Sequence, residues 1–134
     1  MFLQPKKTKY RKAKKGRLAK LEFKSNELHF GEIGLKAEAS GIISAQQIEA
    51  ARQAIARKVK RKGKLWIRVF PDCPITAKPN ESRMGKGKGS VSFWAVKVKG
   101  GTTLFEICGV PQRIAIEALK AGSRKLPIVT RIFD

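Results

Sequence analysis

Apolar side chains recur at steps of three and four in residues 44–63, the period of a helix with one buried face. Ser44 and Gln47 have the spacing of a capping box at its start, and Gly63 fits the position just after its end. The stripe expected to face the core is Ile48, Ala51, Ile55 and Val59. The pattern therefore predicts one amphipathic helix over this stretch.

Shorter apolar stretches are typical of strands. Apolar pieces broken by glycines predict short, bent strands in residues 27–37, which include the single histidine, and in residues 41–44. Residues 65–70 alternate aliphatic with aromatic or basic side chains, which predicts a strand with two different faces. Arg68 is expected on the face opposite the aliphatic side chains of Leu65, Ile67 and Val69.

Two further strands are expected in residues 91–99 and 102–108. Gly100 and Gly101 separate them and tolerate the positive φ angles of a tight turn, so we expect the two strands to pair as a hairpin. Before them, three prolines predict that regular structure stops and that a long loop occupies residues 71–90.

A second, shorter helix follows the hairpin. Pro111 suits its first turn, Ile114 and Ala118 lie one turn apart, and Gly122 is expected beyond its end. Residues 126–133 then close the chain as a strand. Two helices among antiparallel strands predict an α+β fold, an antiparallel sheet sandwich with a basic N-terminal extension and a long Gly/Lys loop.

The charge of the chain implies a polyanionic partner. Thirty Lys and Arg against ten Asp and Glu give a net charge of +20, while the 42% hydrophobic content is that of a folded domain. No apolar run approaches the roughly 20 residues of a membrane-spanning helix, and the N-terminus lacks the apolar region of a signal peptide. We therefore expect nucleic acid, and no membrane, as the partner.

Residues 1–24 hold ten basic side chains and a single acid, Glu22. Self-repulsion keeps such a run extended, and Phe2 and Tyr10 offer rings that can stack on bases. A solvated tail is the alternative, but so dense a run beside a folded domain favours phosphate contact. The expected RNA-binding residues of this arm are Lys6, Lys7, Lys9, Arg11, Lys12, Lys14, Lys15 and Arg17.

A second basic group ends the long helix. One or two cations are enough to complement the negative end of the helix dipole. The larger number of basic residues here therefore favours a second RNA-binding face over a solvated helix end. Its members are Arg57, Lys58, Lys60, Arg61, Lys62 and Lys64.

The stretch "RMGKGKGS", residues 83–90, resembles a phosphate-cradling loop at first sight. A Walker loop needs Ser or Thr directly after Gly-Lys and a helix after the loop, but here glycine follows each Gly-Lys and a strand is expected next. The glycines instead allow close approach of the backbone to RNA, while Arg83, Lys86 and Lys88 neutralise phosphates. A merely flexible, soluble connection is the alternative.

Catalytic chemistry finds little support in the residue types. Cys73 and Cys108 stand far apart, and with His29 alone they are too few for a zinc site. A Cys/His nucleophile pair is less favoured than two half-buried thiols in a reducing compartment. The acids are scattered singly. We expect no catalytic residue, no metal and no cofactor.

Four long motifs in order resemble the L-sixteen family of large-subunit ribosomal proteins, of bacterial and organellar type. They are "LQPKKTKYRKAKKGR", "QIEAARQAIARKVKRKGKLWIRVFPDCPIT", "KPNESRMGKGKG" and "LFEICGVP". The resemblance runs from residue 3 to about residue 128 and covers nearly the whole chain. It implies a structural ribosomal protein of α+β fold and no enzymatic activity.

The resemblance also implies partners for individual segments. The basic arm is expected to be embedded in large-subunit ribosomal RNA among neighbouring ribosomal proteins. The glycine-rich loop is expected to extend toward the acceptor arm of aminoacyl-tRNA near the peptidyl transferase centre. The residues that carry this second role are Arg83, Met84, Gly85, Lys86, Gly87, Lys88 and Gly89.

Departures from the family pattern bear on the compartment. Cys73 stands where lysine is frequent, and residues 20–30 lack the usual glycine-rich character. Together with the lysine-rich arm, these changes favour an organellar ribosome, with the mitochondrion ahead of the bacterial cytoplasm.

The expected organisation is an RNA-binding arm in residues 1–24 and one domain in residues 25–134, from which residues 77–90 project as a loop. A free-standing RNA-binding regulator and a small nucleotide-dependent enzyme are the alternative functions.

Overall fold

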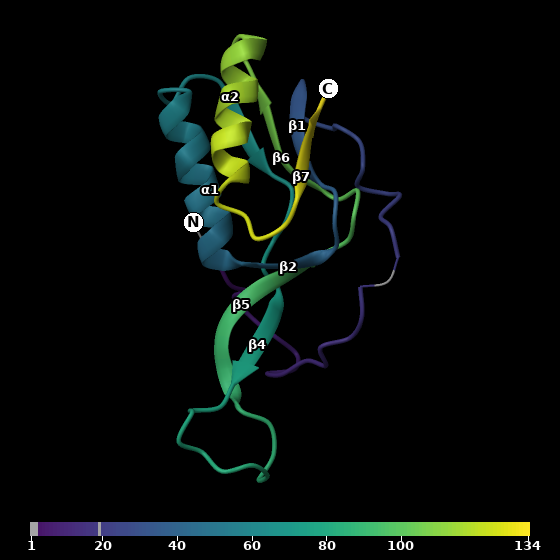
Figure 1. Cartoon of the computed structure of the whole chain (residues 1–134), viewed down its shortest axis with the longest axis vertical. Coiled ribbons are helices and arrows are strands. Elements are labelled where there is room, and N and C mark those ends of the chain that lie inside the picture. Colours follow the sequence, from purple (N-terminus) through teal and green to yellow (C-terminus); the bar gives the residue numbers. More distant parts are fainter. Residues whose placement is uncertain (1–2, 19) are drawn as a thin grey trace.

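Two helices and seven strands make up the described part of the chain, residues 3–18 and 20–134 of a computed structural model (Figure 1). The strands are β1 (Ile33–Ala37), β2 (Gly41–Ser44), β3 (Lys64–Ile67), β4 (Cys73–Ala77), β5 (Ser90–Val98), β6 (Thr103–Cys108) and β7 (Thr130–Phe133). The helices are α1 (Ala45–Lys58) and α2 (Gln112–Ser123). The predicted α+β class is confirmed.

The described strands form two antiparallel sheets. The larger sheet has the order β3-β6-β1-β7 and the smaller one the order β2-β5-β4. Leu35 lies opposite Phe105 in the larger sheet, and Ile43 lies opposite Val96 in the smaller one. Strands β4 and β5 extend away from the helices and carry a projecting loop at their far end (Figure 1).

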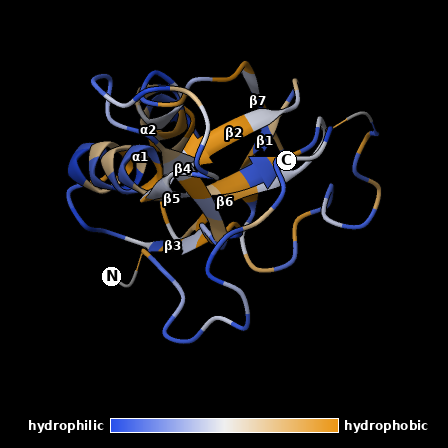
Figure 2. Ribbon diagram, turned by 90° about the horizontal axis from the view of Figure 1, so that it is seen from below, coloured by the Kyte–Doolittle hydropathy of each residue, from blue (hydrophilic) through white to orange (hydrophobic). Residues whose placement is uncertain are grey.

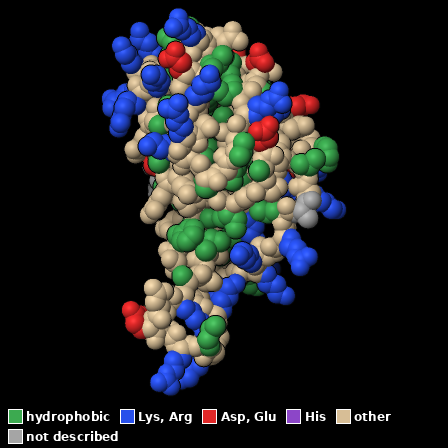
Figure 3. All heavy atoms as spheres, viewed as in Figure 1, with side chains coloured by type: hydrophobic (Ala, Val, Ile, Leu, Met, Phe, Trp, Pro, Cys, Tyr) green, Lys and Arg blue, Asp and Glu red, His purple; other side chains and the backbone are tan. Residues whose placement is uncertain are grey.

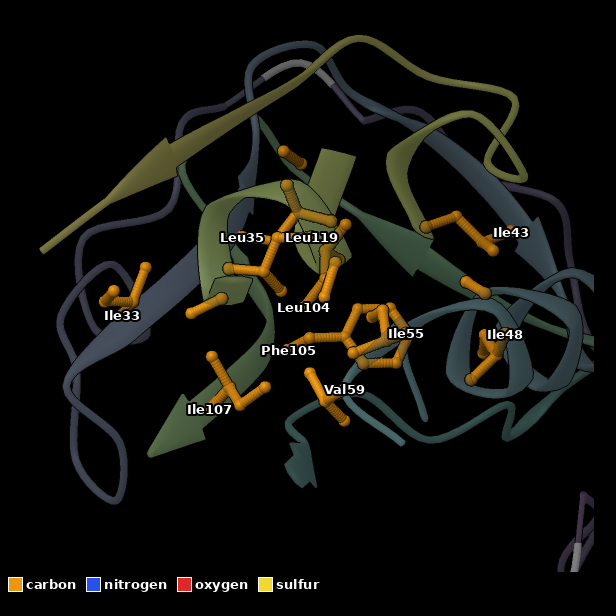
Figure 4. Close-up of a cluster of buried hydrophobic side chains, with 14 of the residues drawn as sticks. Ile33, Leu35, Ile43, Ile48, Ile55, Val59, Leu104, Phe105, Ile107 and Leu119 are labelled. Carbon is orange, nitrogen blue, oxygen red and sulfur yellow. The ribbon is translucent and has the colours of Figure 1, made fainter. Parts of the chain in front are cut away.

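The hydrophobic core fills the space between the helices and the four-stranded sheet (Figure 4). Phe105 of β6 and Ile55 of α1 are both buried there, and Leu119 of α2 joins them. Full burial of each such side chain stabilises the fold by about 1.5–3 kcal/mol. Coloured by hydropathy, much of β2 and β6 is apolar, whereas polar and apolar stretches alternate along the loops (Figure 2).

The start of α1 agrees with the prediction. Gln47 N–H donates to Ser44 Oγ at 3.2 Å, and Ser44 N–H donates to Gln47 Oε1 at 2.9 Å, which is the complete capping box. The predicted stripe is also confirmed, since all of its residues are buried: Ile48, Ala51, Ile55 and Val59.

The end of α1 was predicted too late. The helix ends at Lys58, because Lys60 and Arg61 take positive φ angles of 54° and 61° and turn the chain toward β3. Gly63 belongs to this turn rather than to a helix end. Its φ is 73°, and a side chain there would meet the Cys108 carbonyl oxygen at 2.4 Å.

The predicted hairpin across Gly100 and Gly101 is wrong, although the turn itself is tight. Thr102 N–H donates to the Lys99 carbonyl at 3.1 Å, and Gly101 has a φ of 96°. However, β5 belongs to the smaller sheet and β6 to the larger one. Gly101 N–H donates instead to the Ala37 carbonyl at 2.6 Å. The link between β5 and β6 therefore lies beside the link between β1 and β2, and each of these two links joins one sheet to the other.

The long irregular loop was predicted to begin too early. Residues 73–77 form β4, which includes the buried Pro74. A proline fits there because β4 lies at the edge of its sheet, where a missing N–H need not break the ladder. The irregular loop therefore covers residues 78–89, within the expected 77–90.

The second helix is confirmed, with a shifted end. It follows Pro111 as predicted but includes Gly122, where a side chain would meet Cγ1 of Ile55 at 2.6 Å. Glycine thus allows α2 to approach α1 closely. Ile114 and Ala118, which lie one turn apart as predicted, differ in burial: Ile114 is 40% exposed and Ala118 is buried. Strands β3 and β7 are confirmed but shorter than predicted.

Candidate nucleic-acid interface

Lys and Arg side chains gather in three parts of the surface. Figure 3 shows them over the upper end of the helices, along the lower right side and at the tip of the projecting loop. We call these parts the basic turn (residues 57–64), the arm (residues 3–18) and the loop (residues 78–89).

The arm has neither helix nor strand, and every residue from 6 to 17 is exposed. All of its expected RNA-binding cations are therefore on the surface. Tyr10 is 72% exposed, whereas Phe2 lies outside the described residues. Nζ of Lys97 in β5 donates to the carbonyl of Lys14 at 3.2 Å and to that of Lys15, which ties the arm to the smaller sheet.

The basic turn combines a helix end with a reversal of the chain. Arg57 and Lys58 lie in the last turn of α1, where cations complement the negative end of the helix dipole. Arg61 N–H donates to the Ala56 carbonyl at 3.0 Å, so the turn folds back onto the helix. Lys58 lies 4.0 Å from Glu117, while all of the expected cations are exposed: Arg57, Lys58, Lys60, Arg61, Lys62 and Lys64.

A hollow of about 660 Å³ lies on the outer side of this helix end. Its lining is mostly cationic and consists of Arg52, Gln53, Ala56, Arg57, Lys60 and Arg61. Arg52 was not among the expected residues, although its four-residue spacing places it on the same helical face as Ala56. Its guanidinium lies 2.6 Å from Glu49, so its charge is partly neutralised.

The loop presents a backbone conformation that requires glycine. Gly85 and Gly87 have φ angles of 94° and 85°, and Lys86 between them has a φ of 54°. No other atom would lie within 4 Å of a side chain at either glycine. The glycines therefore serve the turn of the backbone rather than packing inside the protein. Met84 is fully exposed, and Arg83 is exposed beside it.

The base of the loop is tied to the arm. Lys12 Nζ donates to the Lys88 carbonyl at 2.9 Å, and Lys88 Nζ donates to the Ala13 carbonyl. Lys88 is thus in contact with the arm, whereas Arg83 and Lys86 lie farther out along the loop. At Gly89 a side chain would meet the Ala77 carbonyl oxygen at 2.4 Å, so glycine is also required where the loop joins the strands.

A buried ion pair, missed from the sequence, holds the segment before β1. Glu106 of β6 is fully buried and accepts hydrogen bonds from the N–H groups of Phe30 at 2.7 Å and Gly31 at 2.8 Å. His29 N–H and the Arg68 guanidinium also donate to it. Burial opposes ionisation, but these donors outweigh it and hold the pKa of Glu106 below its ordinary value.

The sequence held a signal for this pair. Glu106 is an acid within the apolar stretch "TLFEIC", and Arg68 was predicted to lie away from the aliphatic face of its own stretch. Opposite charges on neighbouring strands at such positions indicate an ion pair. His29, expected in a strand, lies before β1 and is exposed.

The structure brings no catalytic group together in its described part. Cys73 lies in the smaller sheet and Cys108 in the larger one, both half-buried and unbridged. Within residues 3–18 and 20–134, no three His, Cys, Asp or Glu side chains are grouped as metal ligands would be. Neither described helix is long and apolar enough to cross a membrane.

The loop also lacks the surroundings of a nucleotide site. The residue after it begins β5, so a strand rather than a helix N-terminus follows the glycines, as predicted. What remains is a cationic surface of arm, basic turn and loop. Over residues 5–133, the sequence matches the family described as Ribosomal protein L16p/L10e. The chain belongs to this family.

Similar proteins support the same assignment along almost the full length. The chain is 59% identical to "Large ribosomal subunit protein uL16" of Rhizobium etli (strain CIAT 652) over 130 residues, which cover 97% of this chain and 95% of that protein. It is 59% identical to the protein of the same name from Chelativorans sp. (strain BNC1) over 133 residues, 99% and 97% of the two chains. The Sinorhizobium medicae (strain WSM419) protein is 57% identical over 130 residues, 97% and 95% of the two chains.

The resemblance inferred from the four sequence motifs is therefore confirmed. These relatives come from bacteria, so the expected preference for a mitochondrial ribosome is unsupported.

Proposed function

We propose that this chain is a structural component of the large ribosomal subunit and that it binds ribosomal RNA through the arm and the basic turn. The match to the L16p/L10e family over residues 5–133 carries this proposal. As a member of a family of ribosomal proteins, the chain has a structural role and is not an enzyme. Its partners are ribosomal RNA and neighbouring ribosomal proteins, and its location is the ribosome, in a bacterial cytoplasm by likeness to its relatives.

Phosphate neutralisation is the physical basis proposed for RNA binding. The arm and the basic turn expose their cations on a chain of net charge +20. Each phosphate that a cation neutralises releases counterions, so affinity falls steeply with salt. We further propose that the arm is an RNA-bound extension of a single domain formed by residues 25–134.

The second part of the proposal gives the loop a role in positioning aminoacyl-tRNA. It extends beyond the smaller sheet, offers Arg83 and Lys86 as exposed cations and buries almost no apolar surface (Figure 1). Its glycine-dependent backbone allows close approach to a phosphate backbone. These features favour a contact with RNA outside the protein over a role in folding.

The test of the loop is the double variant Arg83→Ala, Lys86→Ala on purified ribosomes. Lys88 is left intact because it contacts the arm. The variant should enter the subunit normally, while the affinity of aminoacyl-tRNA should fall about five- to thirtyfold if each contact contributes ~0.5–1 kcal/mol. Arg113→Ala with Lys120→Ala, which removes two exposed cations from α2, is the matched control.

Two outcomes would count against this role. Unchanged tRNA affinity and peptide formation in the loop variant would refute tRNA positioning, while failure to enter the subunit would make the loop an assembly contact. Co-sedimentation with large subunits after a moderate salt wash tests the ribosomal role itself, since a free-standing RNA-binding regulator would not remain with them.

A further inference from the structure

An exposed aromatic surface lies at the edge strand of the larger sheet, away from the loop. Phe30 is 59% exposed, and its ring stacks on that of Trp66 in β3 with centroids 6.0 Å apart and planes inclined by 20°. The Arg68 guanidinium lies 5.5 Å from the Phe30 centroid, and Lys64 Nζ lies 5.9 Å from that of Trp66. We call these four residues the aromatic platform.

The platform is held in a fixed position. The segment around Phe30 has neither helix nor strand, yet the N–H groups of residues 29, 30 and 31 all donate to the buried Glu106 carboxylate. The same carboxylate pairs with Arg68, which in turn lies beside the Phe30 ring. Backbone and cation are therefore positioned by one buried group before any partner binds, which lowers the ordering cost of binding.

The chemistry of the surface selects its partner. The exposed Phe30 ring offers an apolar π face, and Lys64, beside the Trp66 ring on which Phe30 stacks, is exposed and cationic. An apolar side chain from a protein would cover the ring but would leave Lys64 without a counter-charge. A nucleotide supplies both a flat base for the ring and a phosphate for the cation.

We propose that the aromatic platform is a stacking site for one unpaired base of RNA, with Phe30 against the base and Lys64 near its phosphate. The base must be unpaired, because bases within a duplex are stacked on each other and present only their edges. This inference rests on the proposed binding of ribosomal RNA and adds to it a site that shares Lys64 with the basic turn and lies outside the arm and the loop.

The first test measures binding of a short single-stranded RNA that contains 2-aminopurine, whose fluorescence is quenched by stacking. Phe30→Leu keeps an apolar side chain but removes the π face, so affinity should fall about tenfold. The slope of log affinity against log salt should stay unchanged, because the variant keeps every cation. Phe23→Leu, at a ring 78% exposed but outside the platform, is the matched control and should bind as the wild type does.

The outcomes distinguish the stacking site at Phe30 from RNA binding by the protein in general. Equal affinities for wild type and Phe30→Leu would overturn the stacking site alone. Absence of salt-dependent binding by the wild type would overturn RNA binding and the stacking site together. Phe30→Trp offers a larger ring and should retain or increase affinity, so the site remains testable if the leucine variant does not fold.

The second test uses the protein in assembled large subunits. Ultraviolet irradiation should covalently link a nucleotide to the peptide that contains Phe30 or Trp66. Mass spectrometry of the digested subunit would identify this adduct. Lys64→Gln should lower both the adduct yield and, with the isolated protein, the salt slope by about 0.7. A cross-link from these rings to a protein side chain, with no nucleotide adduct, would overturn the proposal.

Discussion

The buried carboxylate of Glu106 lies 2.8 Å from the N–H of Gly31, which joins a segment without regular structure to the central strand β6. Glycine is required at this point, because a side chain would meet the backbone N and O of Ile107 at 2.8 and 2.9 Å. The close approach that glycine permits brings the carboxylate within reach of the N–H. One acid thus fixes the path of a stretch that the sequence pattern left undefined.

Removing the charge of Glu106 should destabilise the fold strongly. Glu106→Gln leaves Arg68 without its counter-charge in a largely buried position, and breaking a buried pair in this way costs about 3–5 kcal/mol. Urea denaturation should show the decrease in the free energy of unfolding. Glu32→Gln, at an exposed acid in the same region, is the control and should change it little. Equal stabilities would show that the pair contributes nothing.

The same group should make stability depend on pH in a defined direction. The pKa of Glu106 is lowered in the folded state, so its stabilising contribution is fully present above the pKa of the unfolded chain, about 4.3. It is lost as pH falls from there through the folded pKa. The difference in unfolding free energy between wild type and Glu106→Gln should therefore shrink between pH 5 and pH 3 in urea titrations. A constant difference would contradict the assignment.

Local patterns along the chain predicted the helices and most strands, because each depends on spacing within one segment. The capping box at Ser44 and the buried stripe that includes Ile55 are examples. Sheet membership depends on distant partners instead. The turn at Gly101 is tight, as predicted, but β1 occupies the place beside β6 that a hairpin would have given to β5.

The candidate interface, too, could be predicted from the sequence only where its features depend on one segment. Charge density and glycine spacing indicated the arm, the basic turn and the loop, because cations of these segments stay on the surface of almost any fold. The pairing of Glu106 with Arg68, and the stacking of Phe30 on Trp66, join residues far apart in the sequence. The register of β3 against β6 places Trp66 opposite Glu106, and the hydrogen bonds from the N–H groups of residues 29–31 to Glu106 bring Phe30 beside them.

The packing of the two helices should be sensitive to one methyl group. In Gly122→Ala the new side chain would meet Ile55 at 2.6 Å, and Ile55 is fully buried and cannot move away. Overpacking of this kind costs roughly 1–3 kcal/mol, which we expect to outweigh the gain of about 1 kcal/mol in helix propensity. Thermal unfolding should show a lower midpoint, whereas Lys120→Ala on the exposed side of α2 should leave it nearly unchanged. A higher midpoint for Gly122→Ala would mean that the helices can separate.

Removal of the arm should separate RNA binding from folding. Deleting residues 1–17 removes eight cations and no residue of the hydrophobic core, and the arm's hydrogen bonds to Lys88 and Lys97 are exposed. We therefore expect cooperative unfolding with a midpoint within about 3 °C of the wild type. The affinity for ribosomal RNA should fall, and the salt slope should decrease by about 0.7–0.9 for each phosphate that the arm no longer neutralises.

A full-length variant with glutamine at those eight positions distinguishes the charge of the arm from its backbone. If the arm acts through phosphate neutralisation, this variant should bind RNA as weakly as the deletion does and show the same reduced salt slope, since the backbone carbonyls that bind Lys88 and Lys97 remain. A deletion that unfolds without cooperativity would make the arm part of the folded domain. An unchanged salt slope in both variants would instead place the RNA contacts on the basic turn, the aromatic platform or the loop, because both variants retain these proposed RNA-binding surfaces.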